Sequence, residues 1–379
     1  MTSQPEQPEQ PQQPERAQPP HEDTVLLDRV GPGGRLGRIT LNRPRAINAL
    51  DHPMVRRMRA ALVDWADDDE VAAVLVTGAG ERGLCAGGDI RAIRADALRG
   101  GQAARAFWRD EYLLNARIAA YPKPYVAIMD GVVMGGGVGI SAHGDVRIVT
   151  ERSTVAMPET GIGFVPDVGG TYLLSRAPGE LGTHLALTAG AIGAADSILC
   201  GLADHFVPAD RLPALLDALA VEAPADAAAR FAEAAPAGEL AERRGWIDAC
   251  YAADTVEEIV DRLLGSGEPA AKEAAELIAA KSPTSLKVTL AALRRARALD
   301  SLALVLDQEY RVSCASLATA DLVEGIRAQV VDKDRDPRWS PATLAQVGAA
   351  EVEAFFAPLG ERELGLAPRS RTGAGSTAG

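Results

Sequence analysis

The sequence predicts an α/β protein with a layered, largely parallel sheet and a helical C-terminal region. The short, uninterrupted apolar run at 71–76 is typical of a strand buried on both faces, the stretches 125–129 and 146–149 look similar, and helical stretches separate them. This spacing favours layered βαβ units. From residue 270 onward, Leu, Ile, Val and Ala recur instead with helical periodicity. The segments with that period are 271–280, 286–298, 301–317 and 321–331.

The composition indicates a soluble globular protein with a large core. The chain has 379 residues, of which 47% are hydrophobic and 24% charged. A formal net charge of -13 and a pI near 5.0 argue against nucleic acid as a partner. The four cysteines are far apart, which favours neither a disulfide framework nor a zinc site and fits a reducing cytoplasm. No run approaches the roughly 20 apolar residues that cross a membrane.

The chain divides into four predicted parts. Residues 1–22 are rich in Gln, Pro and Glu and lack an apolar signal segment, so we expect a disordered tail. Residues 23–220 form the predicted α/β core, and 221–360 a mainly helical region. A loose tail is expected over 361–379, whose end is rich in Gly, Ser and Thr.

The ordered part is predicted to begin with a hairpin and a helix. Residues 25–30 and 36–41 flank the turn sequence GPGG. Asp51 is a suitable N-cap for the helix that follows. Its predicted core positions, at helical spacing, are Met54, Met58, Leu62 and Trp65.

One glycine pattern is a false lead. Gly78, Gly80 and Gly83 match G-x-G-x-x-G, the dinucleotide-binding fingerprint. The stretch continues into LCAGGD before any helical pattern starts, and residues 97–109 contain no acid to bind a ribose hydroxyl. We therefore interpret it as a glycine-rich turn.

Two other glycine loops are suited to stabilising an anion. In CAGGDI, at 85–90, Gly87 and Gly88 precede a helical segment, and the simpler interpretation is a helix start capped by Asp89. Gly135 to Gly137 precede a second helical segment. Two backbone N–H groups from separate loops are what a developing oxyanion requires.

These motifs resemble the enoyl-CoA hydratase/isomerase (crotonase) superfamily. The resemblance is carried by LNRPRAINALD, GLCAGGDI, KPYVAIMDGVVMGGGVG and AMPETGIGFVPDVGG. It implies a crotonase-like (ClpP/crotonase) βαβ superhelix that binds an acyl-CoA, with the thioester oxygen between the amides of Gly88 and Gly136. It also implies a CoA adenine end along Gly88, Asp89 and Ile90. Arg45 is a candidate for contact with the CoA phosphates.

Departures from the general pattern resemble the branch of 3-hydroxyisobutyryl-CoA hydrolases. Hydratases of the superfamily use two glutamates, and one of those positions is Gly139 here, while the other matches Glu159. Asp167 stands where hydratases commonly have glycine. In the hydrolases, a glutamate matching Glu111 contributes to substrate binding. The resemblance implies thioester cleavage in valine breakdown, with no metal or redox cofactor.

The chemistry of these residues leaves two roles open at each acid. Glu159 can act as general base on a water or attack the thioester directly to give a mixed anhydride. Apolar neighbours at Met157, Ile162, Phe164 and Val165 would raise its pKa toward a useful value. Asp167 can bind a 3-hydroxyl group or share a proton with Glu159. It is also a possible N-cap for the segment beginning at Val168.

Alternatives remain at the level of function. An enoyl-CoA hydratase or isomerase is the nearest, and a non-catalytic acyl-CoA-binding scaffold belongs to another class. The acyl preference between 3-hydroxyisobutyryl and 3-hydroxypropionyl is open, and a homo-oligomer is possible. Ser141, His143 and Cys85 are expected to be structural. The helices of 221–360 are expected to cover the acyl end of the pocket.

Overall fold

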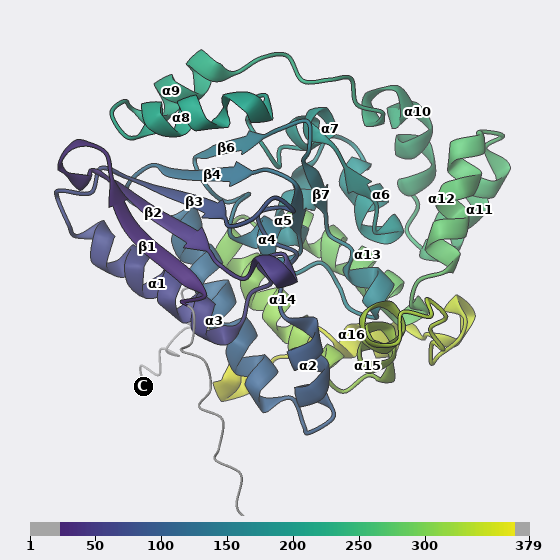
Figure 1. Cartoon of the computed structure of the whole chain (residues 1–379). Helices are drawn as coiled ribbons and strands as arrows, with labels where there is room; N and C mark the ends of the chain where they lie inside the picture. Colours follow the sequence, from purple (N-terminus) through teal and green to yellow (C-terminus); the bar gives the residue numbers. More distant parts are fainter. Residues whose placement is uncertain (1–22, 368–379) are drawn as a thin grey trace, which may run out of the picture.

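The computed structural model describes residues 23–367, and its centre is a six-stranded sheet (Figure 1). The strand order is β1-β2-β3-β4-β6-β9. β1 and β2 pair antiparallel, and every later neighbour in this sheet is parallel. The strands are β1 (Val25–Val30), β2 (Leu36–Leu41), β3 (Ala73–Gly78), β4 (Tyr125–Met129), β6 (Val146–Val149) and β9 (His205–Phe206). The predicted hairpin and the strands at 125–129 and 146–149 are confirmed, whereas β3 begins and ends two residues later than its apolar run.

A second, three-stranded sheet completes the layered core. Its order is β5-β7-β8, formed by β5 (Val132–Met134), β7 (Thr154–Ala156) and β8 (Ala191–Ile192). The chain enters it directly from β4, and the isolated bridges Gly83↔Gly131 and Cys85↔Val133 tie the first glycine loop to it. The α/β class predicted from the alternation of apolar runs and helical stretches is confirmed.

Helix α1 (His52–Ala66) forms for the reasons that the sequence suggested. The Asp51 carboxylate accepts a hydrogen bond from the Met54 N–H, which satisfies an otherwise unpaired donor of the first turn. The four predicted core side chains of this helix are buried. They help to fix α1 against the sheet and against α3 (Gln102–Ala119), the long helix that enters the site.

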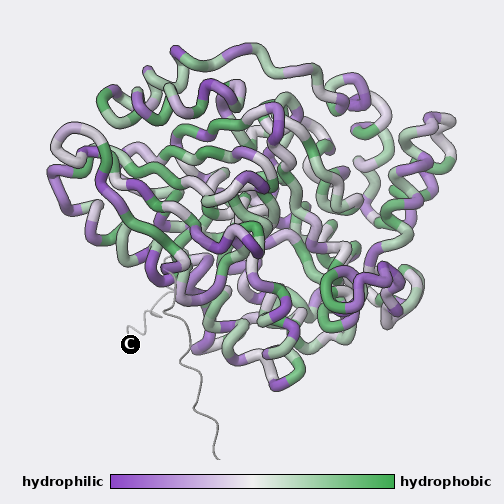
Figure 2. Tube along the Cα trace, viewed as in Figure 1, coloured by the Kyte–Doolittle hydropathy of each residue, from purple (hydrophilic) through white to green (hydrophobic). Residues whose placement is uncertain are grey.

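The C-terminal helices share the core of the N-terminal half. One continuous cluster of buried apolar side chains contains strand residues such as Val76 together with Leu286 and Leu306 from the C-terminal region. Figure 2 shows hydrophobic segments along the central strands and more hydrophilic ones around the outside. The helices are α12 (Pro269–Ala279), α13 (Pro283–Ala298), α14 (Leu302–Ser316) and α15 (Ala320–Ile326), followed by a π-helical turn (Arg327–Val331). The helical periodicity from residue 270 is thus confirmed.

Shorter helices connect these layers. α8 and α9 cover the outer face of the large sheet, where they bury a second apolar cluster (Figure 1). The remaining helices are α2 (Ile90–Ala97), α4 (Gly136–Gly139), α5 (Gly170–Arg176), α6 (Leu181–Thr188), α7 (Ala194–Leu199), α8 (Leu212–Leu219), α9 (Pro224–Phe231), α10 (Leu240–Tyr251), α11 (Val256–Gly265) and α16 (Ala349–Ala354).

The segment 361–367 is attached to the body, which corrects the predicted start of the loose tail. Arg109 donates hydrogen bonds to the carbonyls of Glu363 and Leu364, and the Asp307 carboxylate accepts from the amides of Leu366 and Ala367. These bonds connect the segment to α3 and α14. The predicted tails at 1–22 and 368–379 lie outside the described residues. Between residues 23 and 367, no helix is long and apolar enough to cross a membrane.

Candidate active site

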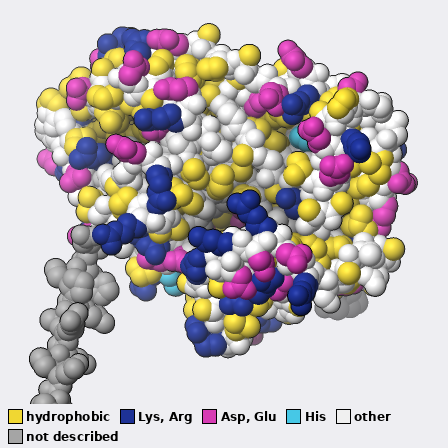
Figure 3. Space-filling model, turned by 45° about the vertical axis from the view of Figure 1, so that its right-hand side comes forward, with side chains coloured by type: hydrophobic (Ala, Val, Ile, Leu, Met, Phe, Trp, Pro, Cys, Tyr) yellow, Lys and Arg dark blue, Asp and Glu magenta, His cyan; other side chains and the backbone are white. Residues whose placement is uncertain are grey.

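A cavity of about 210 Å³ lies where the two halves of the chain meet. The first glycine loop, α3 and the start of α4 form one side, and the loop from Pro158 to Val168 forms another. Leu322, Ile326 and Val330, from α15 and the π-helical turn, complete the wall. Figure 3 shows Lys and Arg side chains around a hollow in the middle of the face drawn. Because Leu322, Ile326 and Val330 belong to the C-terminal helical region, this region contributes directly to the pocket.

The two glycine loops contact each other inside this cavity. The amide nitrogen of Gly88 is 3.3 Å from the point where a Cβ on Gly136 would stand. Gly135 has φ 49° and ψ -117°, and a Cβ there would lie 2.7 Å from Glu159 Oε1, so only glycine fits this turn. Within residues 23–367, neither the Gly88 nor the Gly136 amide donates a hydrogen bond to the protein. Both glycines line the cavity, so their amides are available there as hydrogen-bond donors.

Three carboxyl groups from separate segments also face this cavity. Glu111 comes from α3, Glu159 from a 3-10 turn (Glu159–Ile162), and Asp167 from the loop before α5. Their exposed fractions are 2%, 6% and 5%. Glu111 Oε1 and Glu159 Oε2 have no hydrogen-bond partner among the described residues. A buried carboxylate oxygen without a protein hydrogen-bond partner carries a desolvation cost, and such atoms are typical of ligand-binding sites.

Burial raises the pKa of all three acids, and charge repulsion adds to this at Glu111 and Glu159. For Glu111 and Glu159, burial is the main cause of a strongly raised pKa, and the charge of Asp167 raises it further. Burial raises the pKa of Asp167 to about 7, although a hydrogen bond from Tyr112 acts in the opposite direction. The cluster therefore retains at least one proton near neutral pH, which suits general acid-base chemistry.

The position of Asp167 in the sequence allowed it to be the N-cap of α5, but the structure shows that it is not. Gly169 occupies that position, and the Asp167 carboxylate instead accepts a 2.6 Å hydrogen bond from the Tyr112 hydroxyl. No role for Tyr112 was predicted from the sequence, because its hydrogen-bond partner is 55 residues away along the chain. The one signal in the sequence that could have pointed to Tyr112 is its position directly after Glu111.

Position 139, where hydratases carry an acid, has no room for a side chain. A Cβ on Gly139 would lie 2.6 Å from Val168 Cβ and 2.9 Å from Asn115 Nδ2. Asn115 is fully buried, and neither of its side-chain polar atoms has a partner among the described residues. A second catalytic glutamate at 139 would therefore require the α4 turn and the Val168 loop to move apart.

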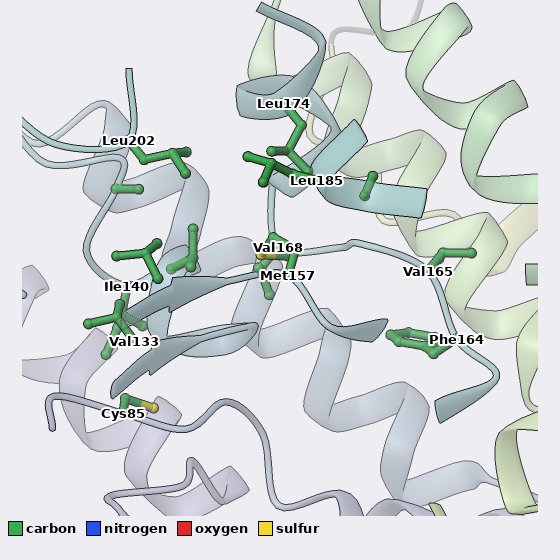
Figure 4. Close-up of a cluster of buried hydrophobic side chains, with 14 of the residues drawn as sticks. Cys85, Val133, Ile140, Met157, Phe164, Val165, Val168, Leu174, Leu185 and Leu202 are labelled. Carbon is green, nitrogen blue, oxygen red and sulfur yellow. The ribbon is translucent and has the colours of Figure 1, made fainter. Parts of the chain in front are cut away.

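Apolar and aromatic side chains form the rest of the pocket wall. Trp108 and Phe164 stack with ring centroids 5.1 Å apart and an interplanar angle of 8°. Ile162 and Phe164 line the cavity, as expected around Glu159. Figure 4 shows Met157 beside Val168, with Phe164 and Val165 farther along the same segment. Met157 and Val165 are buried but do not line the cavity, so they act through burial of the surrounding loop.

The predicted CoA-binding positions fall in two places. Ile90 and the Gly88 backbone line the cavity. The Asp89 side chain caps α2 through the Ala92 N–H and forms a 3.0 Å ion pair with Arg43, so the simpler interpretation of Asp89 is confirmed. Arg45 is exposed and does not line the cavity.

Cys85, Ser141 and His143, which were expected to be structural, are buried or hydrogen-bonded within the protein. Burial raises the pKa of the Cys85 thiol to about 12, which prevents formation of a thiolate near neutral pH. Ser141 donates a 2.6 Å hydrogen bond to the Gly137 carbonyl. His143 Nε2 lies 2.8 Å from the Val168 carbonyl, and burial lowers the His143 pKa to about 4, so it is neutral.

Comparison with known proteins places this site in a family. The family model described as "Enoyl-CoA hydratase/isomerase" matches residues 36–356. A Danio rerio protein named "3-hydroxyisobutyryl-CoA hydrolase, mitochondrial" is 42% identical over 360 residues, 90% of this chain and 91% of that protein. The Homo sapiens protein of the same name is 40% identical over 353 residues, 90% of each chain.

Two solved structures have the same fold and carry different names. The crystal structure of a carnitinyl-CoA dehydratase from Mycobacterium thermoresistibile is 57% identical, with a TM-score of 0.87 over 90% of this chain and 98% of that one. An enoyl-CoA hydratase from Rhodobacter sphaeroides is 44% identical, with a TM-score of 0.85 over 90% and 99%. These likenesses confirm the crotonase-like fold.

Proposed function

Because the chain belongs to the enoyl-CoA hydratase/isomerase family, we propose that its pocket hydrolyses the thioester of a short 3-hydroxyacyl-CoA. The substrate is 3-hydroxyisobutyryl-CoA, the compound in the names of the curated relatives. The observation that carries the proposal is the set of three buried carboxyl groups beside two free glycine amides, with position 139 closed to a further acid.

The first requirement of the reaction is activation of the carbonyl. The thioester oxygen lies between the amides of Gly88 and Gly136, which stabilise the negative charge that develops on it during attack. These donors belong to the backbone of two closely packed loops, so they are already in position when the charge appears. The proposed chemistry uses only groups of the chain and of water, so it requires no metal or redox cofactor.

Glu159 supplies the attacking group. As a general base it takes a proton from a water whose oxygen adds to the carbonyl carbon; collapse of the tetrahedral species then breaks the C–S bond. As a nucleophile its carboxylate attacks directly, CoA thiolate leaves, and water cleaves the resulting mixed anhydride. In both routes the thiolate takes a proton from the carboxyl cluster, whose raised pKa values keep a proton available.

Asp167 and Glu111 hold the acyl group. The Asp167 carboxylate accepts the hydrogen of the 3-hydroxyl group, and a pocket built to bond that hydroxyl rejects acyl groups lacking it. Glu111 lies beside Gly136, since its Oε1 is 2.6 Å from the position of a Cβ there. It faces the carbonyl end of the same substrate.

The test is thiol release by the purified protein from 3-hydroxyisobutyryl-CoA and from crotonyl-CoA. We expect free CoA only from the first. Glu159→Gln should lower kcat by at least about 100-fold because the base or nucleophile is lost. Glu276→Gln, the same change at an exposed residue, is the control. Loss of enoyl absorbance from crotonyl-CoA without thiol release would contradict hydrolysis.

A second candidate is the hydration of an enoyl-CoA. Two unpartnered glutamate oxygens, on Glu111 and Glu159, face one cavity, and paired glutamates position water in hydratases of the family. The names of the two solved structures agree with such chemistry. The crotonyl-CoA experiment separates the two functions.

We further propose that the protein is cytoplasmic, in contrast to the relatives named as mitochondrial.

A further inference from the structure

We propose that Tyr112, supported by Ser313 of α14, is a positioning residue that holds Asp167 as an oriented carboxylate for recognition of the substrate hydroxyl. The inference rests on the proposed function and deepens it. Tyr112 touches no ligand itself; it acts through Asp167. The supporting observation is that Ser313, Tyr112 and Asp167 form one hydrogen-bonded row and that all three side chains are buried.

The row joins α3, α14 and the loop before α5. Tyr112 Oη donates a 2.6 Å hydrogen bond to Asp167 Oδ2. Tyr112 Oη also lies 2.6 Å from Ser313 Oγ. Tyr112 and Ser313 have no exposed surface. A phenol has one proton, so when Tyr112 donates it to the carboxylate, Ser313 must donate to Tyr112. The row is therefore directed from Ser313 through Tyr112 to Asp167.

The neighbours of this row restrict its movement. The Tyr310 ring packs edge-on against Tyr112, with centroids 6.1 Å apart. Glu309, one residue before Tyr310, accepts hydrogen bonds from the amides of Gly169 and Thr171 and from the Thr171 hydroxyl. Helix α14 thus fixes both the Asp167 carboxylate, through Tyr112, and the backbone that follows it.

The electrostatic setting explains why Asp167 needs this donor. Glu111 and Glu159 face Asp167 across the cavity, Glu309 approaches from α14, and His143, bonded to the next carbonyl, is neutral. Burial raises the Asp167 pKa, while the bond from Tyr112 and a backbone amide lower it. Without the tyrosine hydroxyl, the protonated form would predominate at neutral pH and could no longer accept the substrate hydroxyl hydrogen.

The test compares two substrates over a range of pH. The measured quantity is the ratio of kcat/KM for 3-hydroxyisobutyryl-CoA to that for isobutyryl-CoA, which lacks the hydroxyl. In the parent protein this ratio should fall as pH falls and Asp167 gains a proton. In Tyr112→Phe we expect the fall to occur about one pH unit higher and the ratio at pH 7 to drop about fivefold.

Two further variants make the result decisive. Ser313→Ala should shift the ratio in the same direction by a smaller amount, and it remains a test if Tyr112→Phe fails to fold. Tyr310→Phe is the matched control, because its hydroxyl points to the Arg105 carbonyl at 3.4 Å and not to Asp167. An equal loss on both substrates, with the ratio and its pH dependence unchanged, would overturn the inference. Absence of thiol release by the parent would instead contradict the proposed function.

Discussion

Glu111, Glu159 and Asp167 lie in surroundings that oppose their ionised forms, yet the reaction needs at least one carboxylate. Each is almost completely buried, and the Asp167 charge raises the pKa of the other two. Holding such a group ready for a substrate lowers the stability of the free protein. The same residues should therefore limit stability and enable activity, and the pH dependence of stability can reveal this.

Asp167→Asn should stabilise the free protein at pH 8 while lowering activity toward 3-hydroxyacyl substrates. The folded-state pKa of about 7 exceeds the ordinary value of 3.8, so folding favours the protonated form, and stability is lost as pH rises from about 4 through 7. A neutral amide removes that loss. Urea unfolding should show a gain on the order of 1–4 kcal/mol at pH 8 and a smaller gain at pH 5.

The control for this measurement is Asp64→Asn, at an exposed position of α1. Its effect on the free energy of unfolding should stay within about 0.5 kcal/mol at both pH values. A stability of Asp167→Asn equal to or below the parent at pH 8 would show that the carboxylate is better solvated than its burial indicates.

At the scale of elements, the contact between α4, α3 and the Val168 loop controls the chemistry available. Glycine at 139 allows α4 to approach Asn115 and Val168 closely. This contact closes the position used by hydratases and brings Gly136 toward Glu111. The choice between water addition and thioester cleavage is thus linked to helix packing as well as to the identity of the acids.

Gly139→Ala should destabilise the protein by about 1–3 kcal/mol, since the new methyl group meets Val168 Cβ at 2.6 Å. Gly245→Ala is the matched control within a helix. No atom lies within 4 Å of a Cβ built there, and alanine is the better helix former by about 1 kcal/mol. Urea unfolding should move in opposite directions for the two variants. A neutral or stabilising effect of Gly139→Ala would contradict the tight packing.

At the scale of the whole molecule, the pocket is a joint product of the two halves of the chain. The glycine loops and carboxyl groups come from the first half, whereas Leu322, Ile326 and Val330 close the wall from the second. One continuous apolar core packs the two halves of the chain against each other. We therefore expect acyl selectivity to depend partly on residues far from the three carboxyl groups in sequence.

Ile326→Ala should broaden acyl selectivity and reduce stability. The residue is fully buried and lines the cavity, so its truncation enlarges the space available to the acyl chain. We expect kcat/KM for longer 3-hydroxyacyl-CoA thioesters to rise relative to 3-hydroxyisobutyryl-CoA, with a stability loss of about 2–5 kcal/mol. Leu306→Ala, fully buried in α14 away from the cavity wall, should lose similar stability without a change in selectivity. Equal selectivity profiles for the two variants would contradict this role of Ile326 in the cavity wall.

The sequence alone was sufficient for features set by local chemistry. Apolar runs located the strands at 125–129 and 146–149, and the Asp51 cap located the start of α1. The glycine loops and the acids at 159 and 167 were recognisable because backbone approach and acid chemistry require particular residue types. Each of these signals depends on a residue and its near neighbours in the chain.

Only the tertiary structure decided which groups meet. It assigned the Asp167 carboxylate to Tyr112 and removed it from the cap of α5, and it attached residues 361–367 to the body. It also placed Ser313 in the same hydrogen-bonded row and showed that position 139 has no space. The physical reason is distance along the chain: hydrogen bonds and close contacts between residues tens to hundreds of positions apart leave no local pattern, yet they determine the charge and shape of the pocket.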